Sequence, residues 1–177
     1  MFEKCSLVSN RGNDGDSFQV VFPDGEVRHL RLYFVDAPES AVKRYSDGNT
    51  NEKRLRHQGE YFSGLGQKQT VRVGREARSW VKDLLTEAKT FTVFTRGEEV
   101  YQSGRIYALL RVPQGEGERW LHELLVEQGL ARIYTMGTNL PDGTSKEKQL
   151  KRLHGLQRKA KAARKGAWEL ASQPNRS

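Results

Sequence analysis

Short strand-like segments joined by a tight turn constrain the fold more than any other feature of this sequence. Residues 17–22 are rich in β-branched and aromatic side chains, which is typical of a strand. Residues 27–35 alternate apolar and polar side chains, which also indicates a strand. Pro23-Asp24-Gly25-Glu26 lies between them and has the composition of a tight turn. The two segments are therefore expected to form a hairpin.

Periodicity predicts further strands and helices along the rest of the chain. Strands are expected at residues 4–9, 90–95 and 105–112, and helices at residues 74–89, 120–128 and 146–165. Five short strands with few helices predict an α+β chain that is mainly β, a five-stranded OB-type barrel capped by three helices. A length of 177 residues suits one domain spanning residues 1–177.

Residues 40–73 differ from the segments around them. They show no sustained period and are expected to form a long inserted loop, with at most a short helical turn. Seven basic and three acidic residues give the segment a charge of +4, and aromatic residues are interspersed. That mixture suits single-stranded nucleic acid, with Arg44, Arg54 and Arg56 as candidate contacts. A solvated loop pinned to the barrel and a contact between two copies are the alternatives.

The excess positive charge of the chain lies near its C-terminus. The chain has 30 Lys and Arg, 22 Asp and Glu, and a net charge of +8. Residues 146–165 hold nine basic residues and one acidic residue, which accounts for the whole excess. A basic face of this kind favours polyanions such as nucleic acids. A solvated helix face that keeps the protein soluble explains the same pattern.

The sequence gives little guidance on location. No apolar stretch reaches the roughly 20 residues of a membrane span, so no membrane contact is expected. The first ten residues, MFEKCSLVSN, do not have the pattern of a signal peptide. A cytoplasmic protein is expected if the sequence is complete, and a secreted or periplasmic one if Met1 replaces a removed signal.

Charged residues gather where the strands of the predicted hairpin begin and end. Asp14-Gly15-Asp16 precedes the first strand, and Asp36 and Glu39 follow the second. Asp16 and Asp36 could bind a hard cation such as calcium through oxygen ligands, and Glu39 could accept a proton from water. A turn and a set of surface ion pairs are the alternatives.

Two arginines near these carboxylates indicate chemistry at phosphate. Arg31 lies on the second hairpin strand, and Arg105 begins a later strand. Guanidinium groups match phosphate oxygens and stabilise the charge that develops in phosphoryl transfer.

Several motifs, taken in order, resemble the staphylococcal nuclease (thermonuclease) family. The matching residues are Asp14-Gly15-Asp16-Ser17, Arg31-Leu32, Val35-Asp36-Ala37-Pro38-Glu39, Gly74-Arg75-Glu76-Ala77, Ser103-Gly104-Arg105, Gly129-Leu130-Ala131 and the segment from Ala160 to Trp168. They cover nearly the whole chain apart from residues 40–73.

The resemblance implies an OB-fold nuclease that cleaves DNA and RNA with one calcium ion and leaves 5′-hydroxyl and 3′-phosphate ends. A monomer is expected. The residues implied are Asp16, Asp36 and the backbone carbonyl of Ala37 as calcium ligands, Asp14 as their support, Glu39 as general base, and Arg31 and Arg105 on the phosphate.

The resemblance is weaker around the nucleotide. Ala37 stands where members usually have threonine, although a carbonyl ligand does not depend on the side chain. Ser103 stands where members have the tyrosine that packs against the nucleotide. Tyr101 and Tyr134 are therefore the candidates for that contact, and the family's base preference does not carry over.

The alternative to an enzyme is a non-catalytic OB module that binds nucleic acid or protein, since some relatives have lost their catalytic residues. Here the residues that such modules lose are all present: Asp16, Arg31, Asp36, Glu39 and Arg105. Their presence favours the enzyme.

Overall fold

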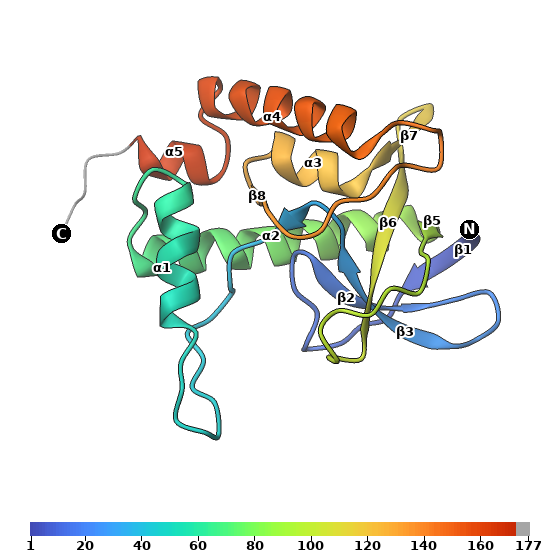
Figure 1. Ribbon diagram of the computed structural model, residues 1–177, viewed down its shortest axis with the longest axis horizontal. Coiled ribbons are helices and arrows are strands. Elements are labelled where there is room, and N and C mark those ends of the chain that lie inside the picture. The colour runs from blue at the N-terminus through green and yellow to red at the C-terminus, as the bar shows by residue number, and fades with distance from the viewer. Residues whose placement is uncertain (173–177) are drawn as a thin grey trace.

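The computed structural model describes residues 1–172, and a closed barrel of five strands lies at its centre (Figure 1). The barrel strands are β1 (Phe2–Leu7), β2 (Ser17–Val21), β3 (Val27–Leu32), β5 (Phe91–Phe94) and β6 (Arg105–Gln114). They pair in the order β3-β2-β1-β5-β6, and a parallel pairing of β3 with β6 closes the sheet. The predicted five-stranded OB-type barrel is thereby confirmed.

Three further strands of residues 1–172 lie outside the barrel. β7 (Gly117–Trp120) extends β6 as a hairpin. β4 (Val35–Asp36) pairs with β8 (Arg132–Ile133) in a separate antiparallel ladder, which places Asp36 opposite Arg132. This small ladder brings together two segments that are distant in the sequence.

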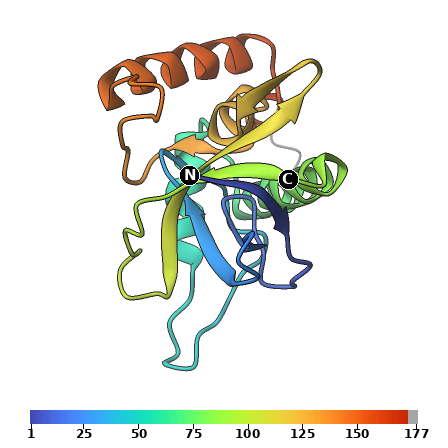
Figure 2. The same ribbon diagram turned by 90° about the vertical axis from the view of Figure 1, so that its right-hand side faces the viewer.

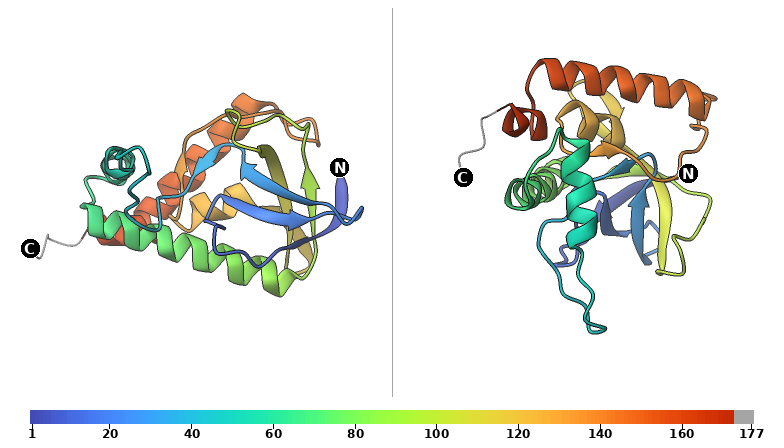
Figure 3. Two further views of the ribbon diagram at one scale, coloured as in Figure 1. Left: turned by 90° about the horizontal axis from the view of Figure 1, so that it is seen from below. Right: turned by 60° about the vertical axis from the view of Figure 1, so that its left-hand side comes forward.

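Residues 1–172 contain five helices, rather than the three expected. They are α1 (Glu52–Tyr61), α2 (Gln67–Ala88), α3 (Leu121–Glu127), α4 (Lys146–Ala162) and α5 (Ala167–Ala171). The predicted helices correspond to α2, α3 and α4. α2 runs along the side of the barrel and extends beyond it to reach α1 (Figure 3), whereas α4 lies over α3 (Figure 2). No helix in this part of the chain combines the length and the hydropathy needed to span a membrane.

The prediction of a loop at residues 40–73 was wrong for much of that segment. It contains all of α1 and the first turns of α2, whereas its tip, near Arg44 and Thr50, projects away from the barrel (Figure 1). The buried residues of α1 are Leu55, Gln58 and Gly59, so only one apolar side chain marks its inner face. Such a face gives no hydrophobic period, which is why sequence periodicity missed the helix.

An aromatic contact anchors the end of α1. Phe62 is fully buried and packs edge-to-face on Trp168 of α5, with ring centroids 5.0 Å apart. Aromatic pairs in this arrangement are stabilising beyond their buried area. The C-terminal end of α1 is therefore fixed to α5.

A buried histidine makes the stability of the fold sensitive to pH. His122 is stacked on Phe34, and its Nε2 accepts a hydrogen bond from Gln149 Nε2 at 2.8 Å. Its Nδ1 has no hydrogen-bond partner within residues 1–172. Burial, with a smaller contribution from Arg152, lowers the pKa of His122 to about 3. The ring is therefore neutral in the folded protein well below the pH at which it protonates in the unfolded chain.

Between pH 7 and pH 4, the free energy of unfolding of the wild type is therefore expected to fall relative to that of a variant without this histidine, since the unfolded state binds a proton at His122 that the folded state does not. The contribution of this residue amounts to about 3 kcal/mol at pH 4. Urea denaturation at pH 7, 5 and 4 measures it, with His122→Gln as the non-titrating comparison. Equal losses of stability in the two proteins would contradict the assignment.

Candidate active site

The candidate site forms where β2 begins and β3 ends. The antiparallel register pairs Ser17 with Arg31, so Asp16 lies beside the arginine. The Arg31 guanidinium bridges the two predicted cation ligands: it donates to Asp16 Oδ1, and to Asp36 Oδ1 at 2.6 Å. All three side chains are buried. The structure thus brings together the carboxylates and the arginine that the sequence motifs indicated.

Asp36 lies at the centre of three arginines. Its Oδ1 accepts from Arg31 and Arg54, each at 2.6 Å, and its Oδ2 accepts from Arg132 Nε at 2.8 Å and Gln58 Nε2 at 2.9 Å. Although burial raises the pKa of Asp36, the three arginines and the amide lower it to about 2. Asp36 is therefore a stable anion, and all of its donors are charged or amide N–H groups.

Asp16 has a less balanced environment. Burial raises its pKa to about 7, with the carboxylates of Asp36 and Asp14 adding to the rise and Arg31 opposing it. Burial also raises the pKa of Asp14, and Glu39 adds to that rise. Positive charge at this end of the site would stabilise both carboxylates.

Glu39 is held by side chains from the segment that follows it. Its Oε1 lies 3.2 Å from Arg54 Nε, and its Oε2 lies 3.3 Å from both Asn51 Nδ2 and Lys43 Nζ. Its backbone N–H donates to Gln58 Oε1 at 3.0 Å. The inserted segment therefore fixes both the carboxylate and the backbone of the candidate base.

Arg105 reaches the same site from β6. The parallel register places it opposite His29, two residues before Arg31. Its Nε donates to Ser103 Oγ at 3.1 Å, and no acidic side chain within residues 1–172 forms an ion pair with it. Its guanidinium is therefore free to bind an anionic ligand.

Two cavities meet at this cluster. One, of about 200 Å³, is lined by Asp14, Asp16, Ala37, Glu39 and other residues. The second, of about 500 Å³, is lined by Asp36, Arg132 and four tyrosines, Tyr45, Tyr101, Tyr107 and Tyr134. Arg31, Arg54 and Arg105 line both. The two cavities are therefore adjacent, and one extended ligand could occupy both.

Two of the tyrosines in the second cavity are well exposed. Tyr101 is 91% exposed and Tyr134 is 59% exposed, and the Arg132 guanidinium lies 4.1 Å from the centre of the Tyr134 ring. The predicted contacts Arg44 and Arg56 line neither cavity. Arg44 forms an isolated β-bridge with Thr50, and Arg56 faces Glu60 at 3.9 Å.

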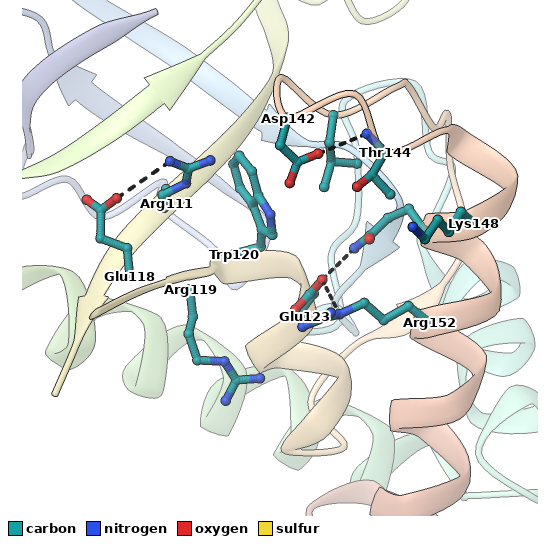
Figure 4. A pocket seen from close by; sticks show the side chains of 11 residues that line it. Arg111, Glu118, Arg119, Trp120, Glu123, Asp142, Thr144, Lys148 and Arg152 are labelled. Atoms are coloured by element: carbon teal, nitrogen blue, oxygen red, sulfur yellow. Dashed lines mark hydrogen bonds and ion pairs between the residues drawn. The ribbon is translucent and has the colours of Figure 1, made fainter. Parts of the chain in front are cut away.

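A larger cavity lies elsewhere, between the β6–β7 hairpin and helices α3 and α4 (Figure 4). It has a volume of about 680 Å³, and Lys148 and Arg152 of the basic segment line it. None of the predicted site residues lies there. Arg152 pairs with Glu123 at 2.8 Å, so part of the charge that the sequence concentrates in this helix is already neutralised.

The oxygen atoms of the site can act as ligands of a hard cation, provided that Asp36 loses one of its hydrogen bonds. Each oxygen of Asp16 accepts one hydrogen bond, as does the Ala37 carbonyl, from Gln58 at 3.1 Å, so each keeps a lone pair. Both oxygens of Asp36 already accept two hydrogen bonds each, which fills the roughly four lone-pair sites of a carboxylate. One donor must leave Asp36 before it can bind a cation. No three acidic, histidine or cysteine side chains converge within residues 1–172 as a metal site.

Gly74 fixes the position of the segment that carries Glu39. A Cβ at Gly74 would lie 2.4 Å from the carbonyl oxygen of Glu39 and 2.5 Å from that of Pro38. No side chain fits there without moving one of the two backbones. The candidate base is therefore packed directly on the backbone of α2.

The substitution Gly74→Ala is expected to lower the free energy of unfolding by about 1–3 kcal/mol, because overpacking displaces well-ordered backbone. Chemical denaturation measures the change. Gly155→Ala, also inside a helix but with no close contact, is the matched control and should raise stability by up to about 1 kcal/mol. Equal effects of the two substitutions would show that the close approach is not constraining.

The barrel and its carboxylate–arginine cluster define an OB-fold protein with a polar site at the strand ends. A comparison with family models identifies the chain further: the model described as Staphylococcal nuclease homologue matches residues 29–170. The chain belongs to this family, whose members typically use Ca²⁺. A comparison with curated proteins finds no match. The family match includes Arg31, Asp36, Glu39 and Arg105, whereas Asp16 precedes it.

Proposed function

We propose that this protein, acting as one domain, is a calcium-dependent nuclease that hydrolyses phosphodiester bonds in DNA, RNA or both and leaves 5′-hydroxyl and 3′-phosphate ends. The observation that carries the proposal is the cavity of about 200 Å³ whose wall includes Arg31 of β3, Glu39 of the segment after β4 and Arg105 of β6. Membership of the staphylococcal nuclease homologue family supports it.

The cation would be held by Asp16, Asp36 and the carbonyl of Ala37, with Asp14 behind Asp16. These are the oxygen donors that calcium prefers. When bound there, the ion supplies neutralisation of the phosphate charge. The raised pKa of Asp16 agrees with a position that is short of positive charge.

The protein's own groups would carry the remaining chemistry. Glu39 accepts a proton from water as the water oxygen bonds to phosphorus. The bond between phosphorus and the 5′-oxygen breaks, and that oxygen takes a proton from solvent to leave as a hydroxyl, so the phosphate remains on the 3′-oxygen. Arg31 and Arg105 hold the non-bridging oxygens and stabilise the charge that grows on them.

The second cavity suits the nucleotides that flank the scissile phosphate. Exposed tyrosines beside arginines bind single strands by stacking and phosphate contact. Tyr101, Tyr134 and Arg54 would make these contacts in a monomeric protein. Arg44 and Arg56 lie outside the cavity and would meet only a strand long enough to pass it.

Cleavage of labelled single-stranded DNA, double-stranded DNA and RNA tests the proposal, each with calcium and with EGTA. Cutting is expected only with calcium, and the new 3′ ends should become substrates for a polymerase only after phosphatase treatment. Binding without cutting under every condition would overturn the enzyme assignment and favour a non-catalytic OB module.

A further inference from the structure

We propose that Arg54 acts as a competitor of the cation, so that calcium binds Asp36 only when the Arg54 guanidinium leaves it. The inference rests on the proposed function for the identity of the cation. It concerns α1, which lies in the segment inserted after Glu39, and it assigns to that helix a role in controlling the cation site.

The occupancy of Asp36 is the first observation. Its four donor contacts come from Arg31, Arg54, Arg132 and Gln58, which leaves no lone pair for a cation. Binding therefore requires one of these four contacts to break.

The burial of the four donors selects Arg54 as the one that moves. The side chains of Arg31 and Arg132 are only 9% and 8% exposed, and Gln58 is fully buried. The side chain of Arg54 is 44% exposed, so its guanidinium can move into water without leaving a buried charge unpaired. Arg31, Arg132 and Gln58 are buried, so none of them can exchange Asp36 for water as readily, and Arg132 would be left as a buried charge without its carboxylate.

The position of the Arg54 contact also suits competition. Arg54 binds Asp36 Oδ1, the oxygen that Arg31 holds next to Asp16. Without Arg54, Asp36 Oδ1 would accept from Arg31 alone, which leaves one of its lone pairs for a cation beside Asp16. The same guanidinium contacts Glu39 Oε1 at 3.2 Å, so its departure frees the candidate base as well, whereas Asn51 and Lys43 still hold Oε2.

Calcium titration of the whole protein, by calorimetry or by competition with terbium luminescence, tests the inference without any measurement of cleavage. The variants are Arg54→Met and, as the matched control, Lys43→Met. Both remove one positive charge that contacts Glu39, but only Arg54 contacts Asp36. Both variants therefore lose a similar amount of repulsion between a side-chain positive charge and the cation. They differ in whether a contact with Asp36 is removed.

Arg54→Met is expected to bind calcium about tenfold more tightly than Lys43→Met, which is the effect of one charge-assisted hydrogen bond that no longer has to break. Calcium binding by Arg54→Met where the wild type shows none would also support the inference. Equal affinities of the two variants, weaker binding by Arg54→Met, or no binding by any protein would overturn it.

Two further arms keep the result clear. Arg54→Lys, for use if Arg54→Met does not fold, should also bind more tightly than the wild type, since one ammonium cannot contact Asp36 and Glu39 as the guanidinium does. An unchanged affinity in Arg54→Lys would then count against the competition. If the wild type cleaves in a calcium-dependent manner but the Arg54 and Lys43 variants have equal calcium affinities, the nuclease proposal stands and this inference alone is removed.

Discussion

Replacement of Glu39 by glutamine is expected to lower kcat for nucleic-acid cleavage by about 10²- to 10⁴-fold, the usual contribution of a general base. Glutamine has the shape of glutamate but cannot accept the proton of the attacking water. Oligonucleotide affinity should stay within a few fold, because Arg31 and Arg105 are unaltered. Single-turnover cleavage and a binding titration on the same substrate separate the two effects.

Glu60→Gln is the matched control for this experiment. Glu60 lies on α1, is exposed, and faces Arg56 rather than the site, so its loss should leave kcat unchanged. Cleavage by Glu39→Gln at the rate of the control would remove Glu39 from the mechanism.

The second large effect is expected on stability. Asp36→Asn should lower the free energy of unfolding by about 3–5 kcal/mol, because it removes the one anion that Arg31, Arg54 and Arg132 share, two of them buried. Urea denaturation measures the loss. The same substitution should weaken calcium binding, since Asp36 is a proposed ligand.

An exposed aspartate–arginine pair provides the comparison. Asp24 contacts Arg28 at 2.6 Å, but its side chain is 44% exposed, so Asp24→Asn should cost less than about 1 kcal/mol. If the two asparagine variants proved equally stable, the buried cluster would not depend on the charge of Asp36.

The barrel could be predicted because its signals are local. Alternation in residues 17–22 and 27–35, with a proline–glycine turn between them, gives the β2–β3 hairpin without knowledge of the rest of the chain. α1 could not be found in this way, because its buried residues are Leu55, Gln58 and Gly59, of which only Leu55 has an apolar side chain. Its burial depends on partners in the site that no local pattern reveals.

The same distinction applies to the site. Asp16, Arg31, Asp36 and Glu39 were indicated by motifs at strand ends, and the structure places them together. Gln58 and Arg132 were missed as site residues, since their contacts with Asp36 span 22 and 96 positions in the sequence. Arg132 reaches Asp36 through the β4–β8 ladder, a pairing that arises only when the chain folds.

The parallel pairing of β3 with β6 joins the two ends of the barrel sheet and also sets the spacing of two arginines. Arg105 lies opposite His29, and Arg31 opposite Tyr107, so both guanidinium groups leave the same face of adjacent strands. The hydrogen bonds that close the barrel thus also set the distance between these two arginines, which under the proposed function would bind the phosphate. Substrate recognition in this protein would therefore be tied to the cooperativity of folding. A mutation that weakens the β3–β6 pairing would change the distance between the two guanidinium groups and lower the barrier to unfolding at the same time.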